Sequence, residues 1–306
     1  MNSFTSHSLP AEILCVMLEQ EEEICYTNKD YMTILDEEES KYGSDQVDEN
    51  CRRKMVRWCY NVVDFLKLQR CTVSVAVSFL DRYLSNVDES KKEQIFRSRK
   101  QYQLISMTSL YMAIKFNECS IMNMKMFVAM SQGCYSESEM SETEVDILSV
   151  LKWRLCGPTA VNFVEEIFNI LQTTNIKNVS AVASMKTLSN YQLELASGEI
   201  CFISQLPSIT AIAAVLNSIQ LTSRQHLSDA ERYHFFDLIS EKLVSNLNST
   251  EITSSRMLLA DCLKKSSTMD PVKKSFSELP TNVRRKETTK SNQGAGILSP
   301  VCVITS

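Results

Sequence analysis

Glycine and proline are scarce in this chain, with six of each among 306 residues. Average usage, about 7% glycine and about 5% proline, would give roughly three times as many. Hairpin turns and phosphate-binding loops depend on these residues, and a collagen-like chain needs a regular glycine repeat. The composition therefore disfavours β-sandwich, glycine-loop and collagen-like folds, and we expect an all-α protein.

Other sequence signatures are missing as well. The three histidines are too few and too scattered for a metal-binding motif, and neither a P-loop nor a dinucleotide-binding glycine motif occurs. The eleven cysteines form no CxxC pair and no signal peptide precedes them, which favours a reduced, intracellular chain. No apolar run approaches about 18 residues, the length of a membrane span. We expect no metal, no cofactor, no catalytic residues and no membrane partner.

Charge is distributed unevenly along the chain. Residues 1–50 carry 13 acidic and 2 basic side chains, residues 51–262 carry 21 and 22, and residues 263–306 carry 3 and 8. We therefore expect an acidic, partly flexible N-terminal segment and a basic, Ser/Thr-rich flexible tail around a neutral core. A neutral core and a pI of about 5.5 also disfavour a nucleic-acid partner.

In the first half of the core, apolar residues recur at helical spacing. The stripes run over Met55–Leu66, Val73–Leu84, Leu104–Ile114, Met124–Val128 and Met140–Leu151. The last helix begins with Ser136 and Glu139 at capping-box spacing. We expect it to close at Gly157, with Pro158 in the first turn of the next helix and a loop over residues 86–99.

A second set of apolar stripes follows. The stripes run over Val161–Leu171, Met185–Leu195, Ile209–Ile219 and Phe235–Leu247. Pro207 opens the third, and each half has an alanine-bearing middle helix. The order of apolar stripes repeats after about one hundred residues. This repeat predicts two tandem five-helix bundles, over residues 51–156 and 157–262.

Charged residues are embedded in these apolar helices. Lys115 and Glu144, taken singly, fit a solvated helix face. Asp81 differs because apolar residues surround it in the sequence, and a buried carboxylate there needs a partner such as Arg52.

Taken together, these stretches resemble the cyclin family, in the family's order, over about residues 51–262. The matching stretches are residues 52–58, 76–85, 112–116 and 144–153 in the first half, and residues 158–163 and 206–211 in the second. The resemblance implies two tandem cyclin folds that bind and allosterically activate a cyclin-dependent protein kinase in cell-cycle control, without being an enzyme.

The resemblance also implies roles for individual residues. Arg52 and Asp81 correspond to a buried structural ion pair. Lys115, Phe116 and Glu144 correspond to the residues that contact the partner kinase. The family usually has an acidic residue after that phenylalanine, and this chain has asparagine there.

Many cyclins carry a docking patch on the first helix that reads Arg-x-Leu-type segments of substrates or inhibitors. Trp58 and Gln103 match that patch and Met55 stands in place of its leucine. Cys51, Lys54 and Asn61 replace a methionine, an isoleucine and an acidic residue. Because a missing acidic group weakens the selection of arginine, we expect weak or altered docking. Trp58 fits a plain core role equally well.

Residues 79–84 and 151–155 resemble D-type cyclins most, which implies a G1/S role. The order Leu14, Cys15, Glu19 departs from the spacing of the D-type Leu-x-Cys-x-Glu motif. Ser299 precedes a proline and is a candidate phosphorylation site. The basic cluster 284–286 fits a solvated surface cluster better than a nuclear address. We expect the protein in the nucleus and cytoplasm.

Two alternatives remain open at the level of sequence. A transcription-associated or other cyclin-fold scaffold would use the same bundles without activating a cell-cycle kinase, and it predicts a basic core face. An undetected helical enzyme would need a set of convergent titratable groups, and no motif supplies one.

Overall fold

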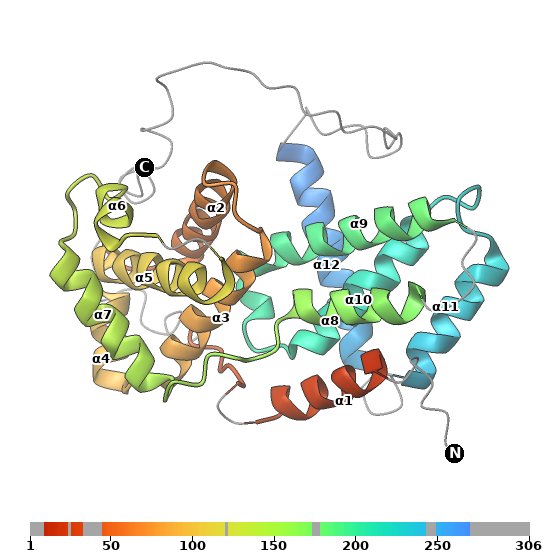
Figure 1. Ribbon diagram of the computed structural model, residues 1–306, viewed down its shortest axis with the longest axis horizontal. Helices are drawn as coiled ribbons and strands as arrows, with labels where there is room; N and C mark the ends of the chain where they lie inside the picture. The colour runs from red at the N-terminus through yellow and green to blue at the C-terminus, as the bar shows by residue number, and fades with distance from the viewer. Residues whose placement is uncertain are drawn as a thin grey trace.

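The computed structural model describes residues 9–23, 26–32, 45–119, 122–172, 178–242 and 249–269. Every regular element in these ranges is helical, which confirms the all-α prediction. Figure 1 shows the helices gathered into two groups side by side, one from each half of the sequence.

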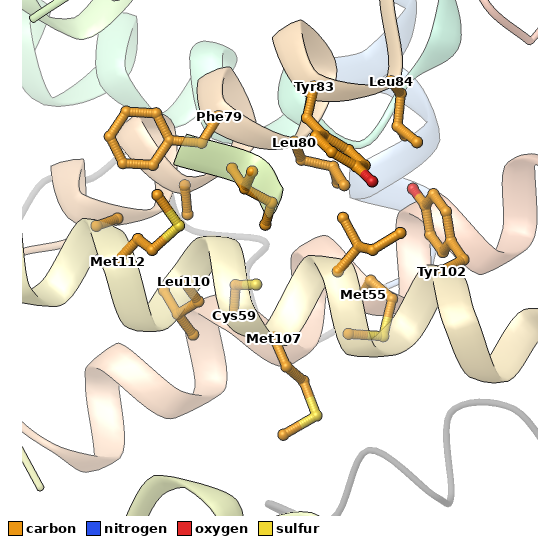
Figure 2. Packing of buried hydrophobic residues seen from close by; sticks show 14 of the residues in the cluster. Met55, Cys59, Phe79, Leu80, Tyr83, Leu84, Tyr102, Met107, Leu110 and Met112 are labelled. Atoms are coloured by element: carbon orange, nitrogen blue, oxygen red, sulfur yellow. The ribbon is translucent and has the colours of Figure 1, made fainter. Parts of the chain in front are cut away.

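The N-terminal half is built around one buried helix. Its elements are α2 (Glu49–Phe65), α3 (Cys71–Asn86), α4 (Glu89–Phe96), α5 (Arg99–Asn117), α6 (Met124–Ala129) and α7 (Glu137–Val150). Every residue of α5 from Ile105 to Ile114 is buried, and α5 packs against α2, α3, α4 and α7. Figure 2 shows residues of this core, among them Met55, Phe79 and Met107.

Local capping explains where several of these helices begin. The carboxylate of Asp48 accepts a hydrogen bond from the backbone N–H of Cys51 at 2.8 Å and so caps α2. Ser136 and Glu139 form the predicted capping box at the start of α7. These bonds satisfy backbone N–H groups that a helix N-terminus otherwise leaves without partners.

The C-terminal half repeats this plan around another buried helix. Its elements are α8 (Ala160–Gln172), α9 (Val179–Ser197), the 3-10 helix η2 (Ile200–Phe202), α10 (Pro207–Leu221), α11 (Asp229–Lys242) and α12 (Ser249–Met269). Pro207 is the first residue of α10, as predicted. Ala211, Ala213 and Ala214 are fully buried, and their small side chains let α8, α9 and α12 pack closely around α10.

A helix that the sequence analysis did not predict, α1 (Leu9–Glu21), precedes both halves. It lies against α8 of the C-terminal half, and Leu14 and Met17 join that core (Figure 1). The buried carboxylate of Glu21 accepts a hydrogen bond from the backbone N–H of Ser208 at 2.9 Å. The acidic N-terminal segment is therefore ordered over this stretch.

Three further expectations need correction. The region expected to be a loop over residues 86–99 contains α4, so the N-terminal half has six helices within the described residues. The helix expected to close at Gly157 ends at Val150, because Lys152 and Trp153 adopt left-handed backbone angles, with φ of 52° and 61°. Residues 263–269, which were expected to belong to the tail, lie in α12, which continues to Met269.

Bidentate ion pairs join the two halves. The guanidinium of Arg53 on α2 binds Glu199 at 2.9 and 3.0 Å, and that of Arg70 binds Glu194 at 2.8 and 2.6 Å. The linker between the halves also packs closely on the N-terminal segment. A Cβ at Gly157 would lie 2.6 Å from Cδ1 of Tyr26, so this contact requires glycine.

The cysteines in the described ranges are free thiols. No group of three or more His, Cys, Asp or Glu side chains in the same ranges is placed to hold a metal ion. None of the described helices is both long and apolar enough to span a bilayer.

Candidate functional site

The C-terminal end of α5 and the middle of α7 bring together the predicted kinase-binding residues. The Nζ of Lys115 forms an ion pair with the carboxylate of Glu144, and it lies 4.7 Å from the centre of the Tyr111 ring. The Lys115 side chain is 40% exposed and that of Glu144 is 14% exposed. Both charges are therefore fixed in position while the ammonium stays accessible.

An apolar surface adjoins this charged pair. Phe116 is 46% exposed, although the edge of its ring packs on Phe79 with centroids 6.3 Å apart. Val145, which follows Glu144 on α7, is also exposed. Exposed apolar side chains beside a fixed charge pair make a surface suited to a protein partner, in which apolar contacts supply affinity and charges set orientation.

The residues after Phe116 face α3 instead. The Nδ2 of Asn117 donates to the hydroxyl of Thr72 at 2.8 Å. The next residue, Glu118, is acidic, but its carboxylate accepts hydrogen bonds from the backbone N–H of Gln69 at 3.0 Å and from the Thr72 hydroxyl. The first acidic side chain after Phe116 is thus engaged at the start of α3.

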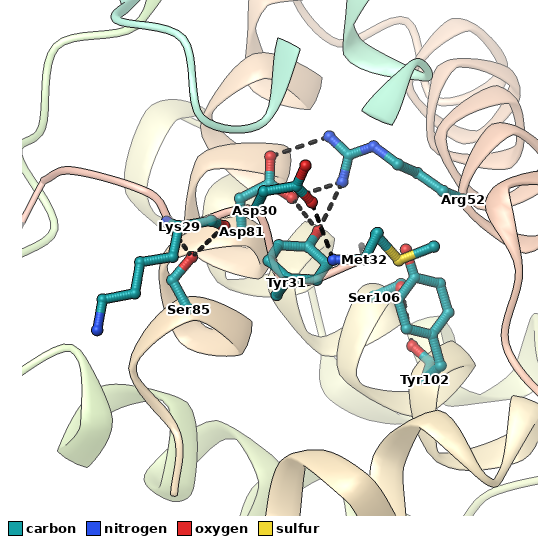
Figure 3. A network of polar contacts seen from close by, with 9 residues as sticks. All are labelled: Lys29, Asp30, Tyr31, Met32, Arg52, Asp81, Ser85, Tyr102 and Ser106. Carbon is teal, nitrogen blue, oxygen red and sulfur yellow. Dashed lines mark hydrogen bonds and ion pairs between the residues drawn. The ribbon is translucent and has the colours of Figure 1, made fainter. Parts of the chain in front are cut away.

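The predicted ion pair between Arg52 and Asp81 is present and buried. Two guanidinium nitrogens bind the two carboxylate oxygens at 2.5 and 2.9 Å. The hydroxyl of Tyr31 donates to Asp81 at 2.6 Å and accepts from Arg52 at 2.9 Å (Figure 3). Burial raises the pKa of Tyr31 well above its ordinary value, so the phenol stays protonated and remains a donor. The pair joins α2, α3 and the segment before α2.

The three residues assigned to a docking patch lie in the core. Met55, Trp58 and Gln103 are 2%, 2% and 3% exposed. The Trp58 ring packs edge-on against Phe127 of α6, with centroids 6.2 Å apart. Their burial fits a core role, and their role in substrate binding stays a prediction. Ser299 lies outside the described residues.

Two functional contacts escaped sequence reasoning. Tyr31 completes the buried ion pair from a segment without apolar periodicity, so no local signal marks it. Glu21 caps α10 from far away in the sequence, although the spacing of Leu14, Met17 and Leu18 on α1 is an amphipathic signal that could have revealed the helix.

These observations define a protein of two tandem helical bundles with an interaction surface on the first. Residues 12–156 match the family described as "Cyclin, N-terminal domain". The fold of the chain also matches the X-ray structure of a viral cyclin from herpesvirus saimiri, with a TM-score of 0.56 and 17% identity. That match covers 74% of this chain and 90% of the viral one. Residues 12–156 are thus similar to the cyclin N-terminal domain, and the comparisons support the cyclin family.

Similar curated proteins carry cyclin names of other subtypes than D. Cyclin-A2-2 of Arabidopsis thaliana is 28% identical over 169 residues, which are 55% of this chain and 36% of that protein. G2/mitotic-specific cyclin C13-1 of Daucus carota is 28% identical over 183 residues, or 60% and 50% of the two chains. This chain therefore spans half or less of the length of these relatives. The cyclin family predicted from sequence is supported, and the D-type assignment is not confirmed.

Proposed function

We propose that this chain is a regulatory subunit that binds and activates a cyclin-dependent Ser/Thr protein kinase in cell-cycle control. The observation that carries the proposal is the surface formed by Lys115, Phe116 and Glu144, which joins an exposed aromatic ring to an oriented charge pair. The resemblance to cyclins assigns these same positions to kinase contact. The chain supplies binding energy and no catalytic group or cofactor.

The mechanism is a shift between two states of the kinase. In an inactive cyclin-dependent kinase, the helix bearing the glutamate that pairs with the phosphate-binding lysine is rotated away. A rigid surface that binds only the rotated-in arrangement stabilises the active state. Moving that equilibrium from about 1:99 to 99:1 requires roughly 5.5 kcal/mol of differential affinity. The buried helix α5 makes the surface rigid, because Lys115 and Phe116 both lie on it and α5 packs against α3 and α7.

The decisive variant is Lys115→Ala combined with Glu144→Ala. We expect the tagged variant to recover at least tenfold less kinase and histone-phosphorylating activity from its own cells, because interface residues of this kind contribute about 1.4 kcal/mol or more. The pair is partly exposed, so the same change should cost less than about 1 kcal/mol of stability.

A matched control is available on the other half of the molecule. Lys186 on α9 pairs with Glu165 on α8 at 2.6 Å, and replacing both by alanine removes the same charges away from the proposed surface. We expect kinase recovery to be unchanged in this control. Equal recovery in both double variants would overturn the assigned surface. Kinase recovery without activity would favour the scaffold alternative.

The finer assignment, D-type-like with a G1/S role, rests on residues 79–84 and 151–155. The matched relatives are named A-type or mitotic cyclins, and they do not support it. Protein abundance in synchronised cells tests the assignment. A maximum around the G1/S transition supports it, and a maximum in G2 or mitosis would place the chain with its A-type relatives instead.

Docking and localisation are further parts of the proposal. We expect weak or altered binding of Arg-x-Leu peptides, since Trp58 is buried against α6. Tight binding that Trp58→Ala abolishes in a folded variant would contradict this. We also propose residence in the nucleus and cytoplasm, which fluorescence imaging of the tagged chain tests.

A further inference from the structure

The ring of Tyr111 lies against the charged pair of the proposed kinase-binding surface. Lys115 follows Tyr111 by one turn on α5, and side chains on a helix lean toward its N-terminus, so the lysine lies over the ring. The Nζ of Lys115 is 4.7 Å from the ring centre, within the distance of about 6 Å at which a ring face attracts a cation. Glu144 binds the same ammonium from a different helix, α7.

Tyr111 is itself buried and held by the core. Its side chain is 6% exposed, and its ring packs on that of Phe127 in α6, with centroids 5.4 Å apart. Its hydroxyl donates to the carbonyl oxygen of Met122 at 3.5 Å. The ring therefore has a fixed position and offers a partner almost no surface of its own. Its route to a partner runs through Lys115, the exposed cation that it contacts.

We infer that Tyr111 is a positioning residue of this surface, whose ring holds the Lys115 ammonium in place beside Glu144 before the kinase binds. The inference rests on the proposed function. A free lysine side chain samples many rotamers, and ordering it during association weakens binding. Two fixed contacts, one with a ring and one with a carboxylate, order the lysine in advance, so less affinity is lost when the kinase arrives.

An aromatic ring suits this role for a physical reason. An ammonium group has three N–H donors and no acceptor. A second carboxylate beside Lys115 would add a negative charge that competes with the partner. The ring is neutral and attracts the cation through its quadrupole, so it orients the ammonium without cancelling its charge. The partly exposed Lys115 is then both ordered and available to the kinase.

A second contact between a lysine and a tyrosine provides the matched control. The Nζ of Lys100 lies 5.7 Å from the centre of the Tyr135 ring, and Tyr135 is also 6% exposed. Lys100 and Lys115 are about 22 Å apart along the axis of α5, at about 1.5 Å per residue. Tyr135→Leu thus removes an equally buried ring and a similar contact, far from the proposed surface.

The first measurement uses the full chain without a kinase. The ring current of Tyr111 shifts the ε-methylene protons of Lys115 upfield, and NMR with selective ¹³C labelling of lysine detects this signal, which Lys115→Arg identifies. We expect Tyr111→Phe to keep the shift, because it keeps the ring, and Tyr111→Leu to abolish it. Tyr135→Leu should leave the signal unchanged. A Lys115 signal that Tyr111→Leu does not move would overturn the inference.

The second measurement is the affinity of the full chain for the kinase that it recovers from its own cells. A cation–ring contact of this kind corresponds to a two- to fivefold change in affinity, roughly, and we expect that loss in Tyr111→Leu. Tyr111→Phe and Tyr135→Leu should bind as the native chain does. Because Tyr111 acts through Lys115, the loss should vanish when Lys115→Ala is already present. An equal loss with and without Lys115 would show a purely structural role and overturn the inference.

The remaining outcomes separate this inference from the proposed function. Native affinity in a folded Tyr111→Leu variant would overturn the inference alone, since the chain would still bind the kinase. Failure of the native chain to recover a kinase would overturn the proposed function and this inference together. If circular dichroism shows that Tyr111→Leu does not fold, Tyr111→Met replaces it in both measurements, because a flexible methionine fills irregular gaps in a core.

Discussion

The two halves of the molecule share a plan of helices around one buried helix, and they differ in the polar groups at their centres. In the N-terminal half the centre is an ion pair, Arg52 with Asp81. In the C-terminal half it is a neutral network. The side chain of Gln192 donates to Ala214 O at 3.0 Å and to Ser218 Oγ at 2.9 Å, and it accepts from Asn217 at 3.1 Å.

The two centres also differ in where their partners come from. The C-terminal network lies within helices α9 and α10, with Arg256 of α12 bonded to Asn217 at 3.1 Å. The N-terminal ion pair needs the hydroxyl of Tyr31, which comes from the segment before α2. Buried charges cost more desolvation than neutral groups, so they require a complete set of partners. The polar centre of the N-terminal half therefore depends on a segment outside its own bundle, whereas the Gln192 network of the C-terminal half is built from helices of its own bundle.

The largest expected effect is the loss of one ionic partner in the N-terminal half. Asp81→Ala leaves the Arg52 guanidinium buried without its counter-charge, and we expect a loss of about 3–5 kcal/mol in the free energy of unfolding. Urea unfolding followed by circular dichroism measures this loss. The double variant Arg52→Met with Asp81→Leu should lose much less, because it leaves no buried charge. A double variant as unstable as the single one would show that the pair itself stabilises the fold.

The corresponding substitution in the C-terminal half destabilises the fold by a steric clash. Ala213 is fully buried in α10, and Ala213→Leu forces the surrounding helices apart, at a cost of about 1–3 kcal/mol. Ala183→Leu is the control, since Ala183 lies on the exposed face of α9 and should tolerate the larger side chain. Similar losses in both variants would contradict the close packing around α10.

Sequence reasoning found the helices whose signals are local. The apolar stripe Leu104–Ile114 became the buried helix α5, Pro207 opened α10, and Ser136 with Glu139 capped α7. The ion pair between Arg52 and Asp81 was also predicted, because a carboxylate among apolar neighbours needs a partner. Periodicity and capping act over short sequence distances, and the apolar neighbours of Asp81 mark its burial locally. Its pairing with Arg52, which is distant in sequence, was also implied by the resemblance to cyclins.

The structural features that were not predicted from the sequence also have physical explanations. Helix α4 is short and buries only Lys92, Ile95 and Phe96, too few residues for a periodic signal. The end of α7 depends on left-handed angles at Lys152 and Trp153, residues that rarely adopt them. The capping of α10 by Glu21 and the partnering of Asp81 by Tyr31 are long-range contacts. Only folding brings such residues together.

A smaller effect is expected where α1 meets the C-terminal half. The residue before α10, Leu206, has no side-chain cap, and Glu21 supplies the acceptor instead. Glu21→Ala should cost about 1 kcal/mol, as for the loss of a helix cap. Glu19→Ala on the same helix is the control, because Glu19 makes no such contact with α10. Differential scanning calorimetry compares the two variants. Equal melting temperatures would show that Glu21 does not cap α10.

The same contact predicts a pH dependence. Burial raises the pKa of Glu21 above its ordinary value of 4.5, and the hydrogen bond from Ser208 lowers it by less. The folded state then holds the proton more tightly than the unfolded state. Glu21 makes its full contribution to the free energy of unfolding below about pH 4.5. This contribution declines as the pH rises through the pKa of Glu21 in the folded state. Glu21→Gln keeps an acceptor without a charge, so its unfolding free energy should lack this decline.

The smallest expected effect tests whether the two halves behave as separate units. Arg53 and Arg70 carry the ion pairs across the junction, and their side chains are 40% and 42% exposed. Partly exposed pairs contribute about 0–1 kcal/mol each, so Arg53→Ala with Arg70→Ala should lower the melting temperature only slightly.

The sharper measurement is the cooperativity of unfolding. Without these links the halves should melt in two resolved calorimetric transitions, the N-terminal one responding to Asp81→Ala and the C-terminal one to Ala213→Leu. Arg97→Ala, which breaks the pair between Glu93 of α4 and the residue that follows this helix, should leave the number of transitions unchanged. A single transition in the junction variant would mean that apolar contacts between the halves couple them without the ion pairs.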